Sequence, residues 1–301
     1  MRRGVWLGAA AYTIWGLFPL YWKQIEFVPA AQIIAHRIGW SFVTLLPVLA
    51  WSTWRARRHE GQIGFFVSSA SVAIYTVAAL LIAVNWFTYV WAVNHDYVVE
   101  TSLGYFITPL VNVLLGVAVL REGLRPWQWA AVALAAAGVI DLTVVYGTAP
   151  WISLALAASF GTYGLVKKQA PMPPLSGLTL ETGVLFVPAV AFLLFVESRG
   201  TGAFGHAGST PTLLMAGAGV VTTVPLLLFA TAVRHVPLSV IGILQFIAPT
   251  IQFLLGVFVY REPFSRSQLV GFSLVWLALA VFAAEGAVAS TRPPVLDEGE
   301  F

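Results

Sequence analysis

Ten long apolar stretches follow one another along this chain, separated by short segments that contain proline, glycine or charged residues. One crossing of a bilayer takes about 20 mostly apolar residues, and a lone segment in lipid satisfies its backbone hydrogen bonds only as a helix. The stretches therefore predict an all-α integral membrane protein with ten transmembrane helices. Their expected ranges are Gly4–Trp22, Ala31–Trp51, Phe66–Val93, Ser102–Leu120, Trp127–Tyr146, Trp151–Val166, Leu178–Val196, Leu213–Val233, Ser239–Tyr260 and Leu269–Ala287.

The composition excludes the alternatives to a membrane protein. Charged residues make up 10% of the chain, against roughly 25% in ordinary soluble domains. A soluble globule with so little charge would expose wide apolar surfaces, and a disordered chain would need more charge and fewer apolar residues. We therefore expect the lipid bilayer to be a partner of the chain. The lack of a long basic tract argues against nucleic acid as another partner.

Motifs for enzyme chemistry are missing from the sequence. The chain contains no cysteine, no phosphate-binding loop of the type G-x-x-x-x-G-K-[ST] and no H-E-x-x-H zinc motif. Its five histidines do not have the spacing of metal ligands. We expect no enzymatic activity, no catalytic residues, no cofactor and no metal site.

Lysine and arginine residues predict the orientation in the membrane. With the N-terminus in the cytoplasm, eleven of them lie on the inner side, at positions 2, 3, 55, 57, 58, 121, 125, 167, 168, 234 and 292. Four lie on the outer side, at positions 23, 199, 261 and 266. This inner excess places both termini of a multi-pass protein in the cytoplasm, in the inner or plasma membrane of the cell. The polar tail 290–301 is expected to be disordered and cytoplasmic.

An internal repeat with an offset of 140 residues divides the chain into two halves. The aligned pairs are Gly104–Asn112 with Leu244–Gln252, Leu114–Val117 with Leu254–Val257, and Arg121-Glu122 with Arg261-Glu262. Each half then holds five predicted helices, and because five is odd the second half enters the membrane from the opposite side. The sequence thus predicts two inverted five-helix repeats, 1–146 and 147–289. Many secondary transporters have this architecture, with the substrate bound near the midplane between the repeats.

The repeat places a polar stripe on one face of the fourth and of the ninth predicted helix. The stripes contain Tyr105, Pro109 and Asn112 in the fourth helix, and Gln245, Pro249 and Gln252 in the ninth. Each proline frees a carbonyl one turn earlier and kinks its helix, while the polar side chains can hydrogen-bond a ligand. We predict that the stripes line a substrate cavity. The alternative is that the asparagine and the glutamines only join neighbouring helices.

The third predicted helix adds two polar side chains to the same cavity. Asn85 and Tyr89 lie on one face at helical spacing, with Trp86 and Trp91 beside them. An aromatic and sparsely charged lining suits aromatic or amphipathic organic solutes. The alternative is that the tryptophans pack against other helices or face lipid.

Titratable or charged side chains inside apolar stretches are candidates for coupling transport to protons. Here they are His36, Arg37 and Glu181, and the repeat places His36 and Glu181 at opposite depths. If transport is driven by protons, we favour Glu181 over His36, because a carboxyl in an apolar segment can load and release a proton near neutral pH. The alternative places Glu181 at the level of the lipid headgroups. Asp141 and Glu285 lie near helix ends and are expected to reach water.

Two Arg-Glu pairs close short hairpins between predicted helices. In each, we expect the glutamate, Glu122 or Glu262, to cap the N-terminus of the helix that follows. The predicted role is structural, because a carboxylate at that position pairs with free backbone N–H groups.

Four segments carry a family resemblance: Ala11–Lys23 (AYTIWGLFPLYWK), Ala35–Ser41 (AHRIGWS), Asn85–Asn94 (NWFTYVWAVN) and Ser102–Leu110 (SLGYFITPL). They resemble the bacterial RarD proteins of the EamA family, which belongs to the drug/metabolite transporter superfamily. The resemblance covers nearly the whole chain apart from the tail. It implies ten helices in two inverted EamA repeats, an inner-membrane location and a permease of the chloramphenicol-sensitive-protein type.

The function expected from these features is secondary transport of small organic drugs or metabolites by alternating access, with export as the direction that the resemblance favours. A facilitator without ion coupling is an alternative of the same class. A sensor or an assembly subunit is an alternative of another class, and it would tolerate loss of the polar stripes. The sequence leaves open the substrate, the coupling ion and the choice between monomer and homodimer.

Overall fold

The computed structural model describes residues 2–60, 68–120, 125–147, 149–233 and 244–291. These residues form helices joined by short connections, and no strand occurs among them. The helices are α1 (Arg2–Gly16), α2 (Phe18–Trp22), α3 (Ala30–Glu60), α4 (Ser69–Asn94), α5 (Val98–Leu120), α6 (Pro126–Tyr146), α7 (Trp151–Gln169), α8 (Pro174–Ser198), α9 (Ser209–Val233), α11 (Ile247–Leu254) and α12 (Arg266–Thr291), with a 3-10 turn η1 (Lys23–Ile25) and a π-helical turn η2 (Leu255–Val259).

The helices follow the predicted apolar stretches closely, and two stretches are interrupted. The first is broken at Leu17 into α1 and α2, because Pro19 has no N–H and leaves the carbonyl of Trp15 without its helical partner. In the ninth, a turn at Gln245 and Phe246 precedes α11, four residues ahead of Pro249. By contrast, α5 continues through position 109 as one helix.

Among the described residues, five helices are long and apolar enough to cross a membrane by length and composition. They cover Ala30–Ala56, Ser69–Asn94, Pro126–Val145, Pro174–Ser198 and Ser209–Phe229. Two shorter apolar helices cover Ile247–Val259 and Arg266–Val281. Exposed side chains on these helices are largely apolar, as in Ile140 of α6 and Leu213 of α9, which suits contact with lipid tails.

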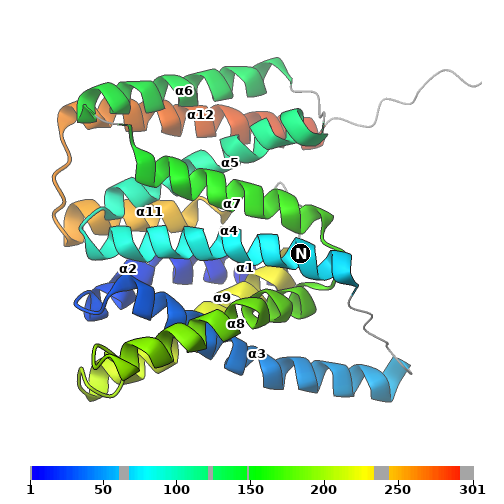
Figure 1. The fold of residues 1–301 in the computed structure, drawn as a ribbon. Helices are drawn as coiled ribbons and strands as arrows, with labels where there is room; N and C mark the ends of the chain where they lie inside the picture. The colour runs from blue at the N-terminus through cyan, green and yellow to red at the C-terminus, as the bar shows by residue number, and fades with distance from the viewer. Residues whose placement is uncertain (1, 61–67, 121–124, 148, 234–243, 292–301) are drawn as a thin grey trace, which may run out of the picture.

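Most of the helix packing joins an element of residues 1–146 to an element of residues 147–289. The α6 helix lies against α12, α5 against α7 and α11, α4 against α7 and α8, α3 against α8 and α9, and α1 against α9 and α11. Figure 1 displays α6 and α12 side by side at one edge of the bundle, with α3, α8 and α9 at the other. The two parts of the chain therefore build one interleaved bundle.

Glycines allow close approach at several of these helix pairs. A Cβ on Gly219 of α9 would collide with the backbone carbonyl of Trp40 in α3, and one on Gly104 of α5 would lie 2.9 Å from the Ser153 carbonyl oxygen in α7. Such contacts bring helix backbones together by dispersion, which is how helices associate where lipid removes the hydrophobic drive. The α3–α9 contact sets the distance across which Arg37 reaches α9.

Glu262 joins the two halves at a connection between helices. Its carboxylate accepts hydrogen bonds from the backbone N–H groups of Val98 (2.7 Å) and Val99 (2.8 Å) at the start of α5. The prediction that Glu262 caps the next helix is wrong, because Ser265 and Gln268 cap α12 by bonding each other's backbone N–H groups. Burial raises the pKa of Glu262, against the opposing effect of the two N–H donors. Glu122 lies outside the described residues.

The predicted tail begins inside a helix. Ser290 and Thr291 are the last residues of α12, and the remainder, 292–301, lies outside the described residues.

Candidate functional site

Arg37 lies in the interior of the bundle, two turns into α3, and is 3% exposed. Its Nε donates a hydrogen bond to Thr222 Oγ1 of α9 at 2.8 Å. The guanidinium carbon lies 4.0 Å from the centre of the Trp86 ring of α4, and 5.4 Å and 5.3 Å from the rings of Phe18 and Trp22 of α2. Described residues of α2, α4 and α9 thus surround the cation of α3 with aromatic faces and the threonine hydroxyl.

The charge of Arg37 has no counter-ion in the described part of the chain. None of the described carboxylates forms an ion pair with it, and its Nη1 is buried without a hydrogen-bond partner. A guanidinium stays protonated in proteins, so it cannot escape this burial by losing its charge. Burying an unpaired ion costs several kcal/mol, and contacts with ring faces offset only part of that cost.

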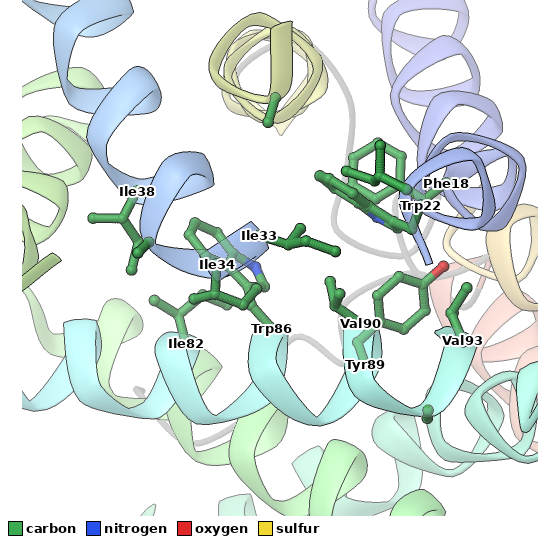
Figure 2. Packing of buried hydrophobic residues seen from close by; sticks show 14 of the residues in the cluster. Phe18, Trp22, Ile33, Ile34, Ile38, Ile82, Trp86, Tyr89, Val90 and Val93 are labelled. Carbon is green, nitrogen blue, oxygen red and sulfur yellow. The ribbon is translucent and has the colours of Figure 1, made fainter. Parts of the chain in front are cut away.

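Two further polar atoms near Arg37 are buried without a partner in the described chain: the Tyr89 hydroxyl and Trp22 Nε1. Tyr89 and Tyr105 lie close enough to Arg37 for electrostatic interaction with its guanidinium. Figure 2 shows the Tyr89 ring extending from α4 toward the segment that carries Trp22. The side chains of Ile33 and Ile34 form the apolar surroundings next to Trp86 in the same view.

Asn85 is one turn before Tyr89 in α4, and its amide is fully used in joining helices. Its Nδ2 donates to the Leu156 carbonyl (3.1 Å) and to Ser159 Oγ (3.0 Å) of α7, and its Oδ1 accepts from the Tyr105 hydroxyl (3.2 Å) of α5. The Tyr105 ring also packs against that of Tyr89, with 5.8 Å between centroids. Asn85 therefore holds α4, α5 and α7 together and orients Tyr105.

Gln252 uses its amide to bridge two halves of the bundle. Its Nε2 donates to the Trp15 carbonyl oxygen (3.2 Å), the group that Pro19 leaves free, and its Oε1 is buried without a partner among the described residues. Gln245 lies at the turn before α11 and is half-buried, while Pro249 is buried in the first turn of α11. This geometry gives Gln252 a helix-joining contact, the alternative that the sequence left open.

The other polar stripe is described only in its backbone and in Tyr105. Pro109 and Asn112 belong to the helix α5, but their side chains lie outside the described part of the structure. The prediction that they line a substrate cavity stays a prediction.

Glu181 is buried in α8 and forms an ion pair. Its Oε1 lies 2.5 Å from Lys167 Nζ of α7, and its Oε2 accepts a hydrogen bond from the Tyr163 hydroxyl at 3.1 Å. Lys167 Nζ also lies 5.0 Å from the centre of the Tyr75 ring of α4. At 1% exposure, Glu181 is enclosed by protein in this structure.

His36 lies next to Arg37 in sequence but faces a different environment. Its imidazole stacks on the Phe204 ring of the α8–α9 connection, with centroids 4.8 Å apart and planes 25° apart. Gln32, one turn earlier, donates to the Thr201 carbonyl oxygen and accepts from the Ala203 N–H, both at 2.9 Å, and so fixes the same connection. His36 and Glu181 are thus not partners, as the repeat predicted.

Glu285 and Asp141, the two acidic residues expected at water, each have one carboxylate oxygen that is buried without a hydrogen-bond partner in the described chain. Glu285 of α12 pairs with Arg125 at the start of α6, with Oε1 and Nη1 2.6 Å apart. Asp141 packs between α6 and α12 near Gly271, and its Oδ2 is buried without a hydrogen-bond partner in the described chain. Neither lies in a group of three or more acidic or histidine side chains that could hold a metal ion, and the described residues contain no such group.

The structure brings Arg37, Tyr89, Tyr105 and Asn85 into one polar region and places Gln252, Glu181 and His36 elsewhere. We call this region, with Trp22, Trp86 and Thr222, the Arg37 site. Sequence reasoning missed Thr222 and Trp22, because a threonine or tryptophan in an apolar helix carries no signal of its own. It also placed Lys167 in a loop, although the residue belongs to α7.

The comparison with known families gives this geometry its context. The EamA-like transporter family matches residues 2–144 and again residues 149–284. The chain belongs to this family. Being an EamA protein with long apolar helices, it is a multi-pass membrane protein of a transporter family.

Relatives place the chain in the RarD branch of the EamA family. It is 44% identical over 281 residues to Protein RarD of Streptomyces exfoliatus, covering 93% of this chain and 88% of the relative. It is 39% identical over 295 residues to Protein RarD of Escherichia coli, covering 97% of each. The protein named Uncharacterized transporter YojE of Bacillus subtilis is 46% identical over 292 residues, 93% of each chain.

A solved structure shares the fold of this EamA protein. The crystal structure of another protein matches with a TM-score of 0.59, covering 96% of this chain and 99% of that chain at 17% identity. At this identity the match speaks for the fold alone.

Proposed function

We propose that this EamA protein is a secondary transporter, or permease, of the inner membrane that exports small organic molecules. Transport proceeds by alternating access between two inverted five-helix repeats, 1–146 and 147–289, with both termini and the tail 290–301 in the cytoplasm. The substrate binds between the repeats near the midplane, and the unit is a monomer or a homodimer.

The pairing of helices is the observation that supports this proposal best. If the five predicted helices of one repeat are exchanged with those of the other, the α1–α9 pair becomes α7–α4, the α1–α11 pair becomes α7–α5, and the α3–α9 pair becomes α8–α4. All six of these pairs pack against each other. The pairs α3–α8, α5–α11 and α6–α12 map onto themselves and also pack. A two-fold packing pattern is what inverted repeats produce.

The position of the polar interior also supports transport. The Arg37 site draws side chains from both repeats, since Arg37, Trp86 and Tyr89 belong to the first and Thr222 to the second. A substrate bound there would contact both parts that move relative to each other. Figure 1 places the C-terminal ends of α3 and α12 on the same side of the bundle, in agreement with a cytoplasmic C-terminus beside the basic segment at positions 55–58.

Uptake into proteoliposomes tests the proposal. The purified protein is reconstituted and a panel of labelled drugs and metabolites is offered with and without a pH gradient. We expect saturable transport of at least one compound class, inhibited by excess unlabelled compound. Protein-free liposomes measure simple diffusion. No saturable flux for any compound, while the protein is folded in the liposomes, would favour a sensor or assembly subunit instead.

A further inference from the structure

We propose that the Arg37 site binds organic anions, and that the substrate of this transporter is a small carboxylate with an apolar or aromatic body. That the bound anion is also transported rests on the proposed function. That the Arg37 site binds an anion rests on the structure alone.

The first argument is the uncompensated charge. The described side chains that interact with the guanidinium are neutral: Phe18 and Trp22 from α2, Trp86 and Tyr89 from α4, Tyr105 from α5 and Thr222 from α9. In the described chain no carboxylate is paired with it. A permanent cation held this way in a membrane protein calls for an anion from outside the chain, and intramembrane charges of this kind mark substrate pathways.

The second argument is a surplus of hydrogen-bond donors. Arg37 Nη1 and Trp22 Nε1 carry N–H groups that can only donate, the Tyr89 hydroxyl can donate, and all three atoms are buried without partners in the described residues. A cation would leave these donors unused, and the carbonyl oxygen of a neutral ester would accept from some of them without compensating the charge of Arg37. A carboxylate accepts several of them at once, and the planar guanidinium matches its two oxygens.

The third argument concerns the rest of the ligand. The guanidinium carbon lies over the Trp86 ring, and Trp86 belongs to an apolar cluster that also contains Phe18 and Ile33 (Figure 2). A multiply charged anion would lose its hydration water in this site and gain only one cation and largely apolar side chains in its place. A monovalent anion with an aromatic or aliphatic body finds one charge partner and apolar contacts for its remaining surface.

Three probes of one shape separate anion binding from general apolar binding. They are phenylacetate, phenylacetamide and phenethylamine, which are anionic, neutral and cationic at pH 7. Binding of radiolabelled phenylacetate to the full-length protein in detergent is measured by scintillation proximity, and the two other probes compete with it. We expect wild type to bind phenylacetate about tenfold more tightly than either competitor, as charge-assisted hydrogen bonds to a buried cation predict.

Variants assign the preference to Arg37. Arg37→Met should weaken the binding of phenylacetate about tenfold and leave the binding of phenylacetamide unchanged. Arg37→Lys should still bind the anion more tightly than the amide, but with lower affinity, because a lysine donates hydrogen bonds without the planar guanidinium. Arg199→Met, which removes an exposed arginine outside the site, should bind all probes as wild type does. If Arg37→Met does not fold, Trp22→Phe removes one unpaired donor, keeps an aromatic ring in place of the indole, and should weaken the binding of phenylacetate alone by several-fold.

The proposal is overturned if wild type binds the three probes equally, or if the folded Arg37→Met protein keeps the preference for phenylacetate. If Arg37→Met does not fold, unchanged binding of phenylacetate by Trp22→Phe would also overturn the proposal. Proteoliposome transport is measured separately. Anion binding at Arg37 without transport of any carboxylate would leave the anion site standing and refute the carboxylate as the substrate. A lack of saturable flux for every compound would refute the transport function itself, whereas transport with equal binding of all three probes would refute the anion site alone.

Discussion

Glu181 of α8 and Lys167 of α7 form a buried ion pair, with Oε1 and Nζ 2.5 Å apart. The Tyr163 hydroxyl completes the shell of the carboxylate by donating to its other oxygen at 3.1 Å. The pair joins two helices within residues 147–289 and lies beside Tyr75 of α4. Protonation of Glu181 would neutralise the carboxylate that Lys167 pairs with, so a coupling role for Glu181 includes opening of this ion pair.

The first prediction concerns that coupling role. In Glu181→Gln the side chain keeps its shape but cannot titrate, and we expect accumulation driven by a pH gradient to fail while substrate exchange continues. Removing one partner of a buried pair costs about 3 kcal/mol, whereas replacing both costs much less. The double variant Glu181→Gln with Lys167→Met should therefore recover thermal stability without recovering accumulation. Normal accumulation in a folded Glu181→Gln protein would leave the pair a purely structural role.

The second prediction concerns the polar stripes. We expect Asn112→Ala and Gln252→Ala each to reduce transport while expression and folding stay near wild type. A lost hydrogen bond between helices in a membrane averages only about 0.6 kcal/mol, even though Gln252→Ala leaves the Trp15 carbonyl without its partner. Gln24→Ala, at an exposed position in η1, serves as the control. Unimpaired transport by both stripe variants would identify the stripes as helix-joining residues.

The third prediction tests the close contact between α3 and α9. A methyl group on Gly219 would collide with the Trp40 carbonyl, so Gly219→Ala should push these helices apart and lower stability by about 1–3 kcal/mol. Gly39→Ala in α3 is the matched control, because a Cβ there meets nothing within 4 Å. Thermal unfolding in detergent compares the two. Equal unfolding temperatures would mean that the helices adjust freely at Gly219.

The fourth prediction is topological. Since wild type has no cysteine, a single cysteine at Ser290 reports the side on which α12 ends. We expect a membrane-impermeant thiol reagent to leave Ser290→Cys unlabelled in intact cells and to label it after permeabilisation. A cysteine placed at Thr148, in the connection 147–150, should react in intact cells. Labelling of the Ser290 variant in intact cells would contradict a cytoplasmic C-terminus.

The helix positions could be predicted well from the sequence, because the length of an apolar stretch is a local property of the chain. The predicted stretch Trp127–Tyr146, for example, corresponds to α6 (Pro126–Tyr146) within one residue. The interruptions were harder to place: Pro19 and Pro249 lie near them, yet position 109 does not break α5. At Pro19 the freed carbonyl of Trp15 accepts a hydrogen bond from Gln252 of another helix, and the sequence alone does not reveal such a contact.

The site was less predictable than the fold, because its members come from different helices and their roles depend on partners. Asn85 and Tyr89 lie on one face of α4, yet Asn85 is saturated by α5 and α7 while the Tyr89 hydroxyl is unpaired among the described groups. Arg37 was singled out in sequence as an intramembrane charge. Only the packing of α2, α4 and α9 around it reveals that aromatic faces, and no described carboxylate, surround that charge.

The last prediction concerns Glu262, which lies in a connection of the second half. Its carboxylate accepts hydrogen bonds from the first two backbone N–H groups of α5, in the first half. Glu262→Ala removes an acceptor from a helix N-terminus and should lower stability by about 1 kcal/mol. In Glu262→Gln the amide oxygen can accept a hydrogen bond from one of the two N–H groups. The amide NH₂ group, which only donates, faces the other N–H group.

The pH dependence distinguishes this carboxylate from its amide. Burial raises the pKa of Glu262 above the ordinary value of 4.5, so the folded protein holds this proton more tightly than the unfolded chain does. The resulting contribution to stability is complete below pH 4.5 and is lost as the pH rises through the folded pKa. Wild type should therefore lose stability relative to Glu262→Gln over that window, in unfolding experiments in detergent across pH 4–8, and then run parallel to it. A wild-type curve that instead gains on the variant as the pH rises would mean that the two N–H donors of α5 outweigh burial.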